Sequence, residues 1–87
     1  MSAKFIVIEG LKGAGKSTAV RHVEAWLRQQ GITQIEKTRE PGGTKAGEQL
    51  REILLSRAEM PLEPNTELLM MLAARAQHIA EVIQPAL

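Results

Sequence analysis

The segment Gly10-Leu11-Lys12-Gly13-Ala14-Gly15-Lys16-Ser17 decides the fold expected of this chain of 87 residues. It is a complete G-x-x-x-x-G-K-[ST] pattern, the signature of a phosphate-binding loop, or P-loop. The apolar run Phe5-Ile6-Val7-Ile8 precedes it, and a helix-compatible run from Ser17 to Gln30 follows it. A strand, a glycine-rich loop and a helix in this order predict an α/β fold with a parallel sheet.

The residue types of the P-loop suit a polyphosphate. Its glycines let the backbone curl with the N–H groups pointing inward, and the following helix adds a favourable dipole. Lys16 is expected to act on the β- and γ-phosphates of ATP during transfer, and the Ser17 hydroxyl to ligate Mg²⁺. A glycine-rich turn that matches by accident is the alternative, which the flanking patterns disfavour. The predicted ATP-binding residues are Gly10, Leu11, Lys12, Gly13, Ala14, Gly15, Lys16, Ser17 and Thr18.

Composition limits the classes of function. The formal net charge is +1 with acids and bases interspersed, so neither nucleic acid nor a membrane surface is an expected partner. No apolar stretch approaches the ~18 residues of a membrane span, and no secretory signal pattern is visible. The chain has no cysteine, which excludes disulfides and thiolate metal sites. We therefore expect a cytoplasmic protein.

Hydrophobic periodicity predicts two strands, at residues 4–9 and 34–38, and three helices. The expected boundary residues are Gly31 at the end of the first helix, Thr44 as the cap of the second, Asn65 or Thr66 as the cap of the third, and Ile83 near its end. The expected core stripes are Val20, Val23 and Leu27 in the first helix, Leu50, Ile53 and Leu54 in the second, and Leu69, Leu72, Ala76, Ile79 and Ile83 in the third.

A second candidate site is the loop Arg39-Glu40-Pro41-Gly42-Gly43-Thr44, which follows the second predicted strand. In open α/β sheets ligands collect beyond the carboxyl ends of strands, and an arginine there can hold a phosphate through a charge-assisted fork. A surface turn with solvated charges is an equally weighted alternative. In the third helix Met71, Arg75 and His78 share a face, for which the pattern alone favours an ordinary polar flank with Met71 in the core. Arg51 lies at a boundary position, where an arginine usually only snorkels.

Three segments of the chain together resemble bacterial thymidylate kinases. They are residues 5–18, the run Thr38-Arg39-Glu40-Pro41-Gly42-Gly43-Thr44, and residues 69–77. The P-loop is shared by a vast superfamily, whereas the Thr-Arg-Glu-Pro-Gly-Gly-Thr run at this distance is far more specific. The resemblance spans essentially the whole chain but only the N-terminal part of the family, less than half of its usual length. Residues 1–87 are therefore expected to be the N-terminal part of a single P-loop kinase domain, incomplete at its C-terminus.

The resemblance implies a P-loop NTPase fold of the nucleoside monophosphate kinase type, truncated to two strands and three helices. The implied reaction is transfer of the γ-phosphoryl of Mg·ATP to dTMP, giving dTDP. Arg39, a catalytic residue by this resemblance, and Arg51 would lie near the phosphate of dTMP. Glu40 would have a positioning or metal-linked role, Arg75 would contact the thymine base, and Met71 would lie beside that base. A homodimer is implied for full-length members of the family.

The chain also departs from the family pattern. Lys12 stands where the family usually has an acidic residue, and Met71 lies near the place of a phenylalanine that commonly stacks on thymine. The Asp-Arg motif of the next strand and the mobile lid are absent, and in the family that next strand lies between the two predicted here. We therefore expect the isolated chain to be marginally stable, aggregation-prone or dimer-dependent, with little or no kinase activity.

Two alternatives stay open. Instead of being part of a thymidylate kinase, the chain could be a truncated P-loop module that binds a nucleotide without catalysis. It could also be part of another P-loop nucleotide kinase. A GTPase is disfavoured, because neither a D-x-x-G switch nor an N-K-x-D guanine reader occurs in the sequence.

Overall fold

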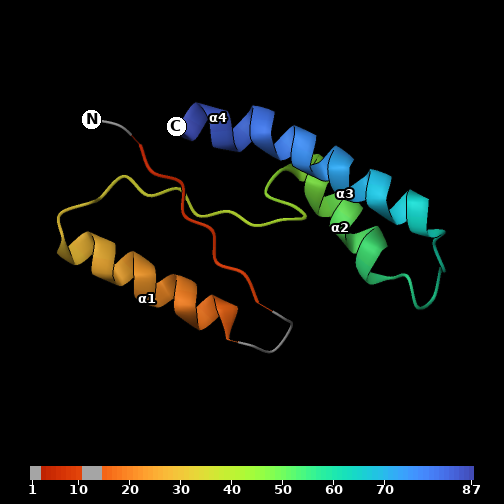
Figure 1. The fold of residues 1–87 in the computed structure, drawn as a ribbon, viewed down its shortest axis with the longest axis horizontal. Coiled ribbons are helices and arrows are strands. Elements are labelled where there is room, and N and C mark those ends of the chain that lie inside the picture. The colour runs from red at the N-terminus through yellow and green to blue at the C-terminus, as the bar shows by residue number, and fades with distance from the viewer. Residues whose placement is uncertain (1–2, 11–14) are drawn as a thin grey trace. The chain divides into compact units, whose positions relative to one another are not determined.

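The computed structural model describes residues 3–10 and 15–87 of the chain. The elements in order are α1 (Lys16–Gln29), α2 (Lys45–Leu55), α3 (Pro64–His78), the π-helical turn η1 (Ile79–Ile83) and α4 (Gln84–Ala86) (Figure 1). The chain divides into two compact units, Met1–Glu36 and Lys37–Leu87. Within the described ranges, no helix combines the length and the apolar character needed to cross a bilayer.

The two predicted strands are not confirmed, because no strand occurs in residues 3–10 or 15–87. The first segment was expected to be buried on both faces, but Phe5, Ile6 and Val7 keep 57%, 55% and 59% of their surfaces exposed. A strand forms where a neighbouring strand exchanges ladder hydrogen bonds with it. The described part of the chain offers neither segment such a neighbour.

Helix α1 agrees with its predicted range to within one residue at each end. Gly31, the predicted stop, directly follows the C-cap residue Gln30 and has a φ of 88°. The amide of Gly31 bonds the carbonyl of Arg28 and that of Ile32 bonds the carbonyl of Leu27, both at 3.0 Å. This pair of bonds is the Schellman motif, which satisfies the last carbonyls of the helix and needs a left-handed residue. The predicted apolar stripe, Val20, Val23 and Leu27, is half-buried.

Helix α2 begins, as predicted, after Thr44. The buried Thr44 Oγ1 accepts a 2.8 Å hydrogen bond from the amide of Gly47. Helices α2 and α3 lie side by side (Figure 1). Of the stripe predicted for α2, Leu54 is buried and Leu50 is half-buried, whereas Ile53 is exposed.

Replacing Thr44 with alanine is expected to lower the free energy of unfolding of the unit Lys37–Leu87 by about 1–2 kcal/mol, because the amide of Gly47 loses its acceptor. Amide hydrogen exchange along α2 measures this loss. Thr44→Ser is the control, since it keeps the acceptor and should retain most of the stability. Equal losses in both variants would assign the effect to the methyl group instead of the cap.

Helix α3 begins earlier than predicted. Its N-cap is Glu63, whose side chain accepts a 3.0 Å hydrogen bond from the amide of Asn65, and Pro64 is the first helical residue. The prediction of Asn65 or Thr66 as the cap is wrong. Proline at the first position has a suitable φ and leaves no orphan N–H, and it holds the preceding residue extended, as the ψ of 142° at Glu63 shows.

The helical run continues past the predicted end near Ile83, through η1 and α4 to Ala86, and it is not a regular α-helix throughout. Beyond His78 the amide of Gln84 bonds the carbonyl of Ile79, five residues back. This wide turn lies directly before Pro85. Proline has no N–H to donate, and its ring crowds the carbonyl four residues back, so a wider turn relieves the clash.

The core stripe predicted for the third helix is wrong in register. The buried residues of α3 are Ala74 and His78, at 0% and 2% exposure, whereas Leu69 and Leu72 are 65% and 49% exposed. The prediction assumes a sheet beneath this helix, and no strand occurs in the described ranges. The face of α3 that carries Arg75 and His78 instead lies against the loop of residues 39–44, because both residues hydrogen-bond to Glu40.

Candidate functional site

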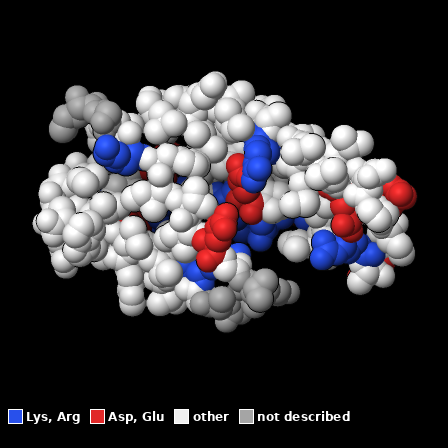
Figure 2. Space-filling model, viewed as in Figure 1, with Lys and Arg blue, Asp and Glu red and all other residues white. Residues whose placement is uncertain are grey.

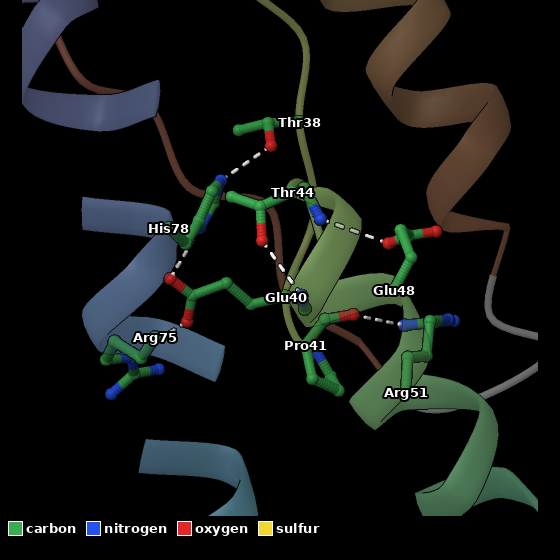
Figure 3. A network of polar contacts seen from close by, with 10 residues as sticks. Thr38, Glu40, Pro41, Thr44, Glu48, Arg51, Arg75 and His78 are labelled. Carbon is green, nitrogen blue, oxygen red and sulfur yellow. Dashed lines mark hydrogen bonds and ion pairs between the residues drawn. The ribbon is translucent and has the colours of Figure 1, made fainter. Parts of the chain in front are cut away.

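The Glu40 carboxylate joins the loop of residues 39–44 to helix α3 (Figure 3). Its Oε1 accepts a 2.8 Å bond from Arg75 Nε, and its Oε2 accepts a 2.9 Å bond from His78 Nδ1. Burial raises the pKa of Glu40, but the hydrogen bonds from His78 and Arg75 outweigh burial, and the pKa lies below its ordinary value of 4.5. The carboxylate is therefore charged at neutral pH and occupied on both oxygens.

Both ring nitrogens of His78 have partners. Nε2 lies 2.6 Å from Thr38 Oγ1, while Nδ1 faces Glu40. Because a carboxylate only accepts, Nδ1 carries a proton, and in the neutral ring Nε2 then accepts from the threonine hydroxyl. These two bonds fix the orientation of the imidazole in its buried position.

Glu48, on α2, holds the loop through its own carboxylate. Its Oε2 accepts from the amide of Gly43 at 3.0 Å and from Arg39 Nε at 3.2 Å, and its Oε1 bonds Arg39 Nη2. The hydrogen bond from Arg39, and after it the hydrogen bond from the amide of Gly43, lowers the pKa of Glu48. The hydrogen bond to Glu48 in turn raises the pKa of Arg39. Both side chains stay exposed. Arg39 is thus a charged side chain that is held in place yet accessible to a ligand.

Arg51 reaches the same loop from the next turn of α2. Its Nη1 donates a 3.0 Å hydrogen bond to the carbonyl of Pro41 (Figure 3). The peptide bond between Glu40 and Pro41 is cis. A side chain that only snorkels would not be fixed on the loop backbone. Arg51 of α2 therefore helps to hold the loop of residues 39–44 in place.

Glycine is required where the loop passes His78. Gly43 has a φ of 79°, in the region that favours glycine, and a Cβ there would lie 2.6 Å from the Cδ2 and Nε2 atoms of His78. The loop backbone therefore approaches the imidazole as closely as it does only because residue 43 has no side chain.

The structure brings four of the five predicted acceptor residues to one loop, namely Arg39, Glu40, Arg51 and Arg75. The fifth, Met71, lies one turn before Arg75 in α3 and is 50% exposed, so the expectation of Met71 as a core residue is wrong. The alternative of a surface turn with solvated charges agrees with the exposure of Arg39, but it does not account for the side chains of two helices that bond residues 39–44.

Sequence reasoning missed three residues that hold this loop: Thr38, Glu48 and His78. The only signal for His78 was its spacing of three residues from Arg75, which places both on one helix face. The interpretation of that face as an ordinary polar flank is wrong, because both residues bond Glu40.

The P-loop belongs to the other unit, and the structure describes only its ends. Gly15 has a φ of 81° and occupies the N-cap position of α1, whose exposed first turn is Lys16, Ser17 and Thr18. Gly15 makes no side-chain cap bond, and the N-terminus of a helix favours an anion through its first amides and its dipole. Gly10 is the last described residue before the loop, and the predictions on Leu11, Lys12, Gly13 and Ala14 fall outside the described residues.

Charges of opposite sign are interspersed over the surface. On the face shown in Figure 2, acidic and basic side chains lie next to one another. Ion pairs away from the loop follow the same pattern, with Arg28 Nη2 2.9 Å from Glu24 Oε2 and Arg57 Nε 3.9 Å from Glu67 Oε1. Acidic partners therefore offset the charges of Arg28 and Arg57 locally.

Acidification is expected to destabilise the unit Lys37–Leu87. Glu40 and Glu48 have folded-state pKa values below 4.5, so their stabilising effect is complete at neutral pH and is lost as the pH falls through 4.5 toward the folded values. Urea unfolding followed by helical circular dichroism, from about pH 6 to about pH 3, measures this loss. Glu40→Gln should flatten the dependence, and an unchanged slope in that variant would remove Glu40 from the explanation.

Comparison with known proteins gives one consistent result. The family model described as thymidylate kinase matches residues 8–87. The thymidylate kinases of Haemophilus ducreyi and Pseudomonas entomophila are each 54% identical to the chain over 87 residues, and that of Thiobacillus denitrificans is 56% identical over 87 residues. In all three cases the match covers 100% of the chain and 41% of the relative. The chain thus spans about two fifths of the length of these curated relatives.

Proposed function

This chain belongs to the thymidylate kinase family, which has a P-loop NTPase fold, and from this premise we propose that it carries the ATP-binding loop and the dTMP-binding loop of a dTMP kinase. The proposed reaction transfers the γ-phosphoryl of Mg·ATP to dTMP and gives dTDP. The observation that carries the proposal is the gathering of Arg39, Arg51 and Arg75 on the loop of residues 39–44.

The acceptor phosphate is assigned to Arg39 and Arg51. An arginine offers a planar fork of donors that suits phosphate oxygens, and two arginines fixed on one loop hold a dianion in one place. Arg39 is tied to Glu48 and Arg51 to the carbonyl of Pro41, so each is oriented before a ligand arrives. In phosphoryl transfer, where alignment and charge neutralisation supply most of the catalysis, such ordering is directly useful.

The nucleobase is assigned to Arg75 and Met71. Arg75 engages Glu40 through Nε, which within the described part of the chain leaves its terminal nitrogens for a carbonyl of the base. Met71 offers an exposed thioether, a soft and adaptable contact for a ring. This contact takes the place of an aromatic stack.

The donor is assigned to the P-loop. The N-terminus of α1 suits an anion, and Lys16 adds a cation at the first position of that helix. The Ser17 hydroxyl would ligate Mg²⁺, together with phosphate oxygens and water. The metal would neutralise charge on the transferred group, while Lys16 and the P-loop backbone would hold the phosphates of the donor.

Family membership also supports two structural proposals. Residues 4–9 and 34–38 become the two strands, with the three helices around them, when the rest of a parallel sheet supplies their ladder hydrogen bonds. The enzyme acts as a homodimer.

A chimera tests the proposed function. In it, residues 1–87 replace the matching segment of the Haemophilus ducreyi thymidylate kinase, which is 54% identical. A coupled assay with ATP and dTMP is expected to give turnover within about tenfold of that relative, a difference of about 1.4 kcal/mol in the barrier. The 87-residue chain alone is the control and should show little turnover.

Two other results would replace this proposal. A folded chimera that phosphorylates a different nucleoside monophosphate, and not dTMP, would identify another P-loop nucleotide kinase. ATP binding with no transfer to any nucleoside monophosphate would identify a binding module.

A further inference from the structure

A chain of hydrogen bonds runs from Thr38 through the buried ring of His78 to the exposed side chain of Arg75. Thr38 Oγ1 meets His78 Nε2 at 2.6 Å, His78 Nδ1 meets Glu40 Oε2 at 2.9 Å, and Glu40 Oε1 meets Arg75 Nε at 2.8 Å (Figure 3). The imidazole is 2% exposed, whereas the Arg75 side chain is 61% exposed. A buried ring and an exposed guanidinium are therefore connected through the Glu40 carboxylate.

We propose that His78 is a positioning residue for the nucleobase side of the acceptor site, acting through Glu40 to orient Arg75. This inference rests on the proposed function, because it takes Arg75 as the residue that meets the base. Arg39, Arg51, Arg75 and Met71 would meet the ligand directly and are not buried, whereas His78 is buried and would act through another side chain.

Glu40 transmits the orientation because its two oxygens serve different partners. With Oε2 held by His78, the plane of the carboxylate is set, and Oε1 then has one direction in which to accept from Arg75. Without the histidine the carboxylate can rotate, and the exposed arginine regains its rotamers and loses affinity for a ligand that must order it. Of the two roles that resemblance leaves to Glu40, the occupied oxygens favour positioning over metal ligation.

The position of Gly43 supports a dedicated role for the ring. Backbone at residue 43 approaches the imidazole so closely that a Cβ would collide with it. The loop thus fits against the histidine on one side while Glu40, three residues earlier, bonds it on another. A displacement of the ring would be transmitted to the acceptor loop at two points.

Paired amide substitutions in the chimera test this inference. In His78→Asn the side-chain amide nitrogen falls near the place of Nδ1 and can still donate to Glu40. In His78→Gln the amide reaches the place of Nε2, keeps the contact with Thr38 and loses that with Glu40. We expect the KM for dTMP to rise about tenfold in His78→Gln and to stay near the parental value in His78→Asn, with kcat and the KM for ATP little changed in both.

Several outcomes would overturn the inference. Equal KM values for dTMP in the parent and in both variants would exclude a positioning role for His78 and leave the proposed function intact. Equal changes in both variants, or changes in the KM for ATP and in kcat of the same size, would indicate a merely structural side chain. If the parental chimera neither binds nor converts dTMP, the proposed function fails, and the inference fails with it.

A spectroscopic measurement keeps the test decisive where a variant does not fold. In the parental chimera, nitrogen-15 NMR should report a proton on Nδ1 of His78, and added dTMP should shift the resonances of Arg75 Nε and His78 Nδ1 together. A shift of Arg75 without any response from His78 would show that the two are not coupled.

Discussion

Replacing Lys16 with methionine is expected to lower the turnover of the chimera with ATP and dTMP by about 10²–10³-fold, the usual cost of removing one group that stabilises charge in the transition state. Lys16 is the first residue of α1 and is exposed beside Gly15, where its ammonium can follow the charge that develops between the β- and γ-phosphates. Methionine keeps a similar length and helix propensity, so α1 should persist. The coupled assay at saturating ATP and dTMP gives kcat.

Lys45→Met is the matched control for this substitution. Lys45 is likewise exposed and is likewise the first residue of a helix, α2, but it has no assigned role. Its replacement should leave kcat unchanged. If Lys16→Met costs less than about tenfold, or if Lys45→Met costs as much, the cation at residue 16 does not act on the transferred phosphoryl group.

Local chemistry could be read from the sequence with good accuracy. Thr44 caps α2 and Gly31 ends α1 as predicted, because a cap depends on residues within one turn of it. The error at the start of α3 is also local: Pro64 specifies a first helical position more strongly than Asn65 or Thr66 specifies a cap.

Features that depend on distant partners could not be predicted. Residues 4–9 have the composition of a strand, but a strand needs a neighbour that composition does not supply. The buried face of α3 was predicted from the positions of its large apolar residues, and the structure buries Ala74 and His78 instead. Hydrophobic periodicity identifies a helix, whereas the partner against which the helix packs decides which side is covered.

The candidate site divides in the same way. Arg39, Glu40, Arg51 and Arg75 were predicted from the Thr-Arg-Glu-Pro-Gly-Gly-Thr run and from resemblance. The contribution of His78 was missed because its partners, Thr38 and Glu40, are 40 and 38 residues away. No spacing rule connects residues at that separation, so only the folded loop shows them together.

Replacing Gly43 with alanine is expected to lower the free energy of unfolding of the unit Lys37–Leu87 by about 2–5 kcal/mol, the sum of a left-handed backbone cost and an overpacking cost. The φ of 79° disfavours any side chain, and the added Cβ would lie 2.4 Å from Thr38 Oγ1 and 2.6 Å from two atoms of the His78 ring. The ring cannot retreat without breaking its bonds to Thr38 and Glu40. Amide hydrogen exchange along α3 reports the loss.

Gly31→Ala separates the two costs, because Gly31 has a similar φ of 88° and nothing within 4 Å of a Cβ placed there. It should show only the backbone cost of about 1–2 kcal/mol, in the unit Met1–Glu36. The excess at Gly43 then measures how firmly the hydrogen-bonded pair of Thr38 and His78 is held against the loop, independently of any ligand. Equal losses at the two glycines would mean that the imidazole moves aside freely, and a side chain that moves so easily could not orient Glu40 and Arg75.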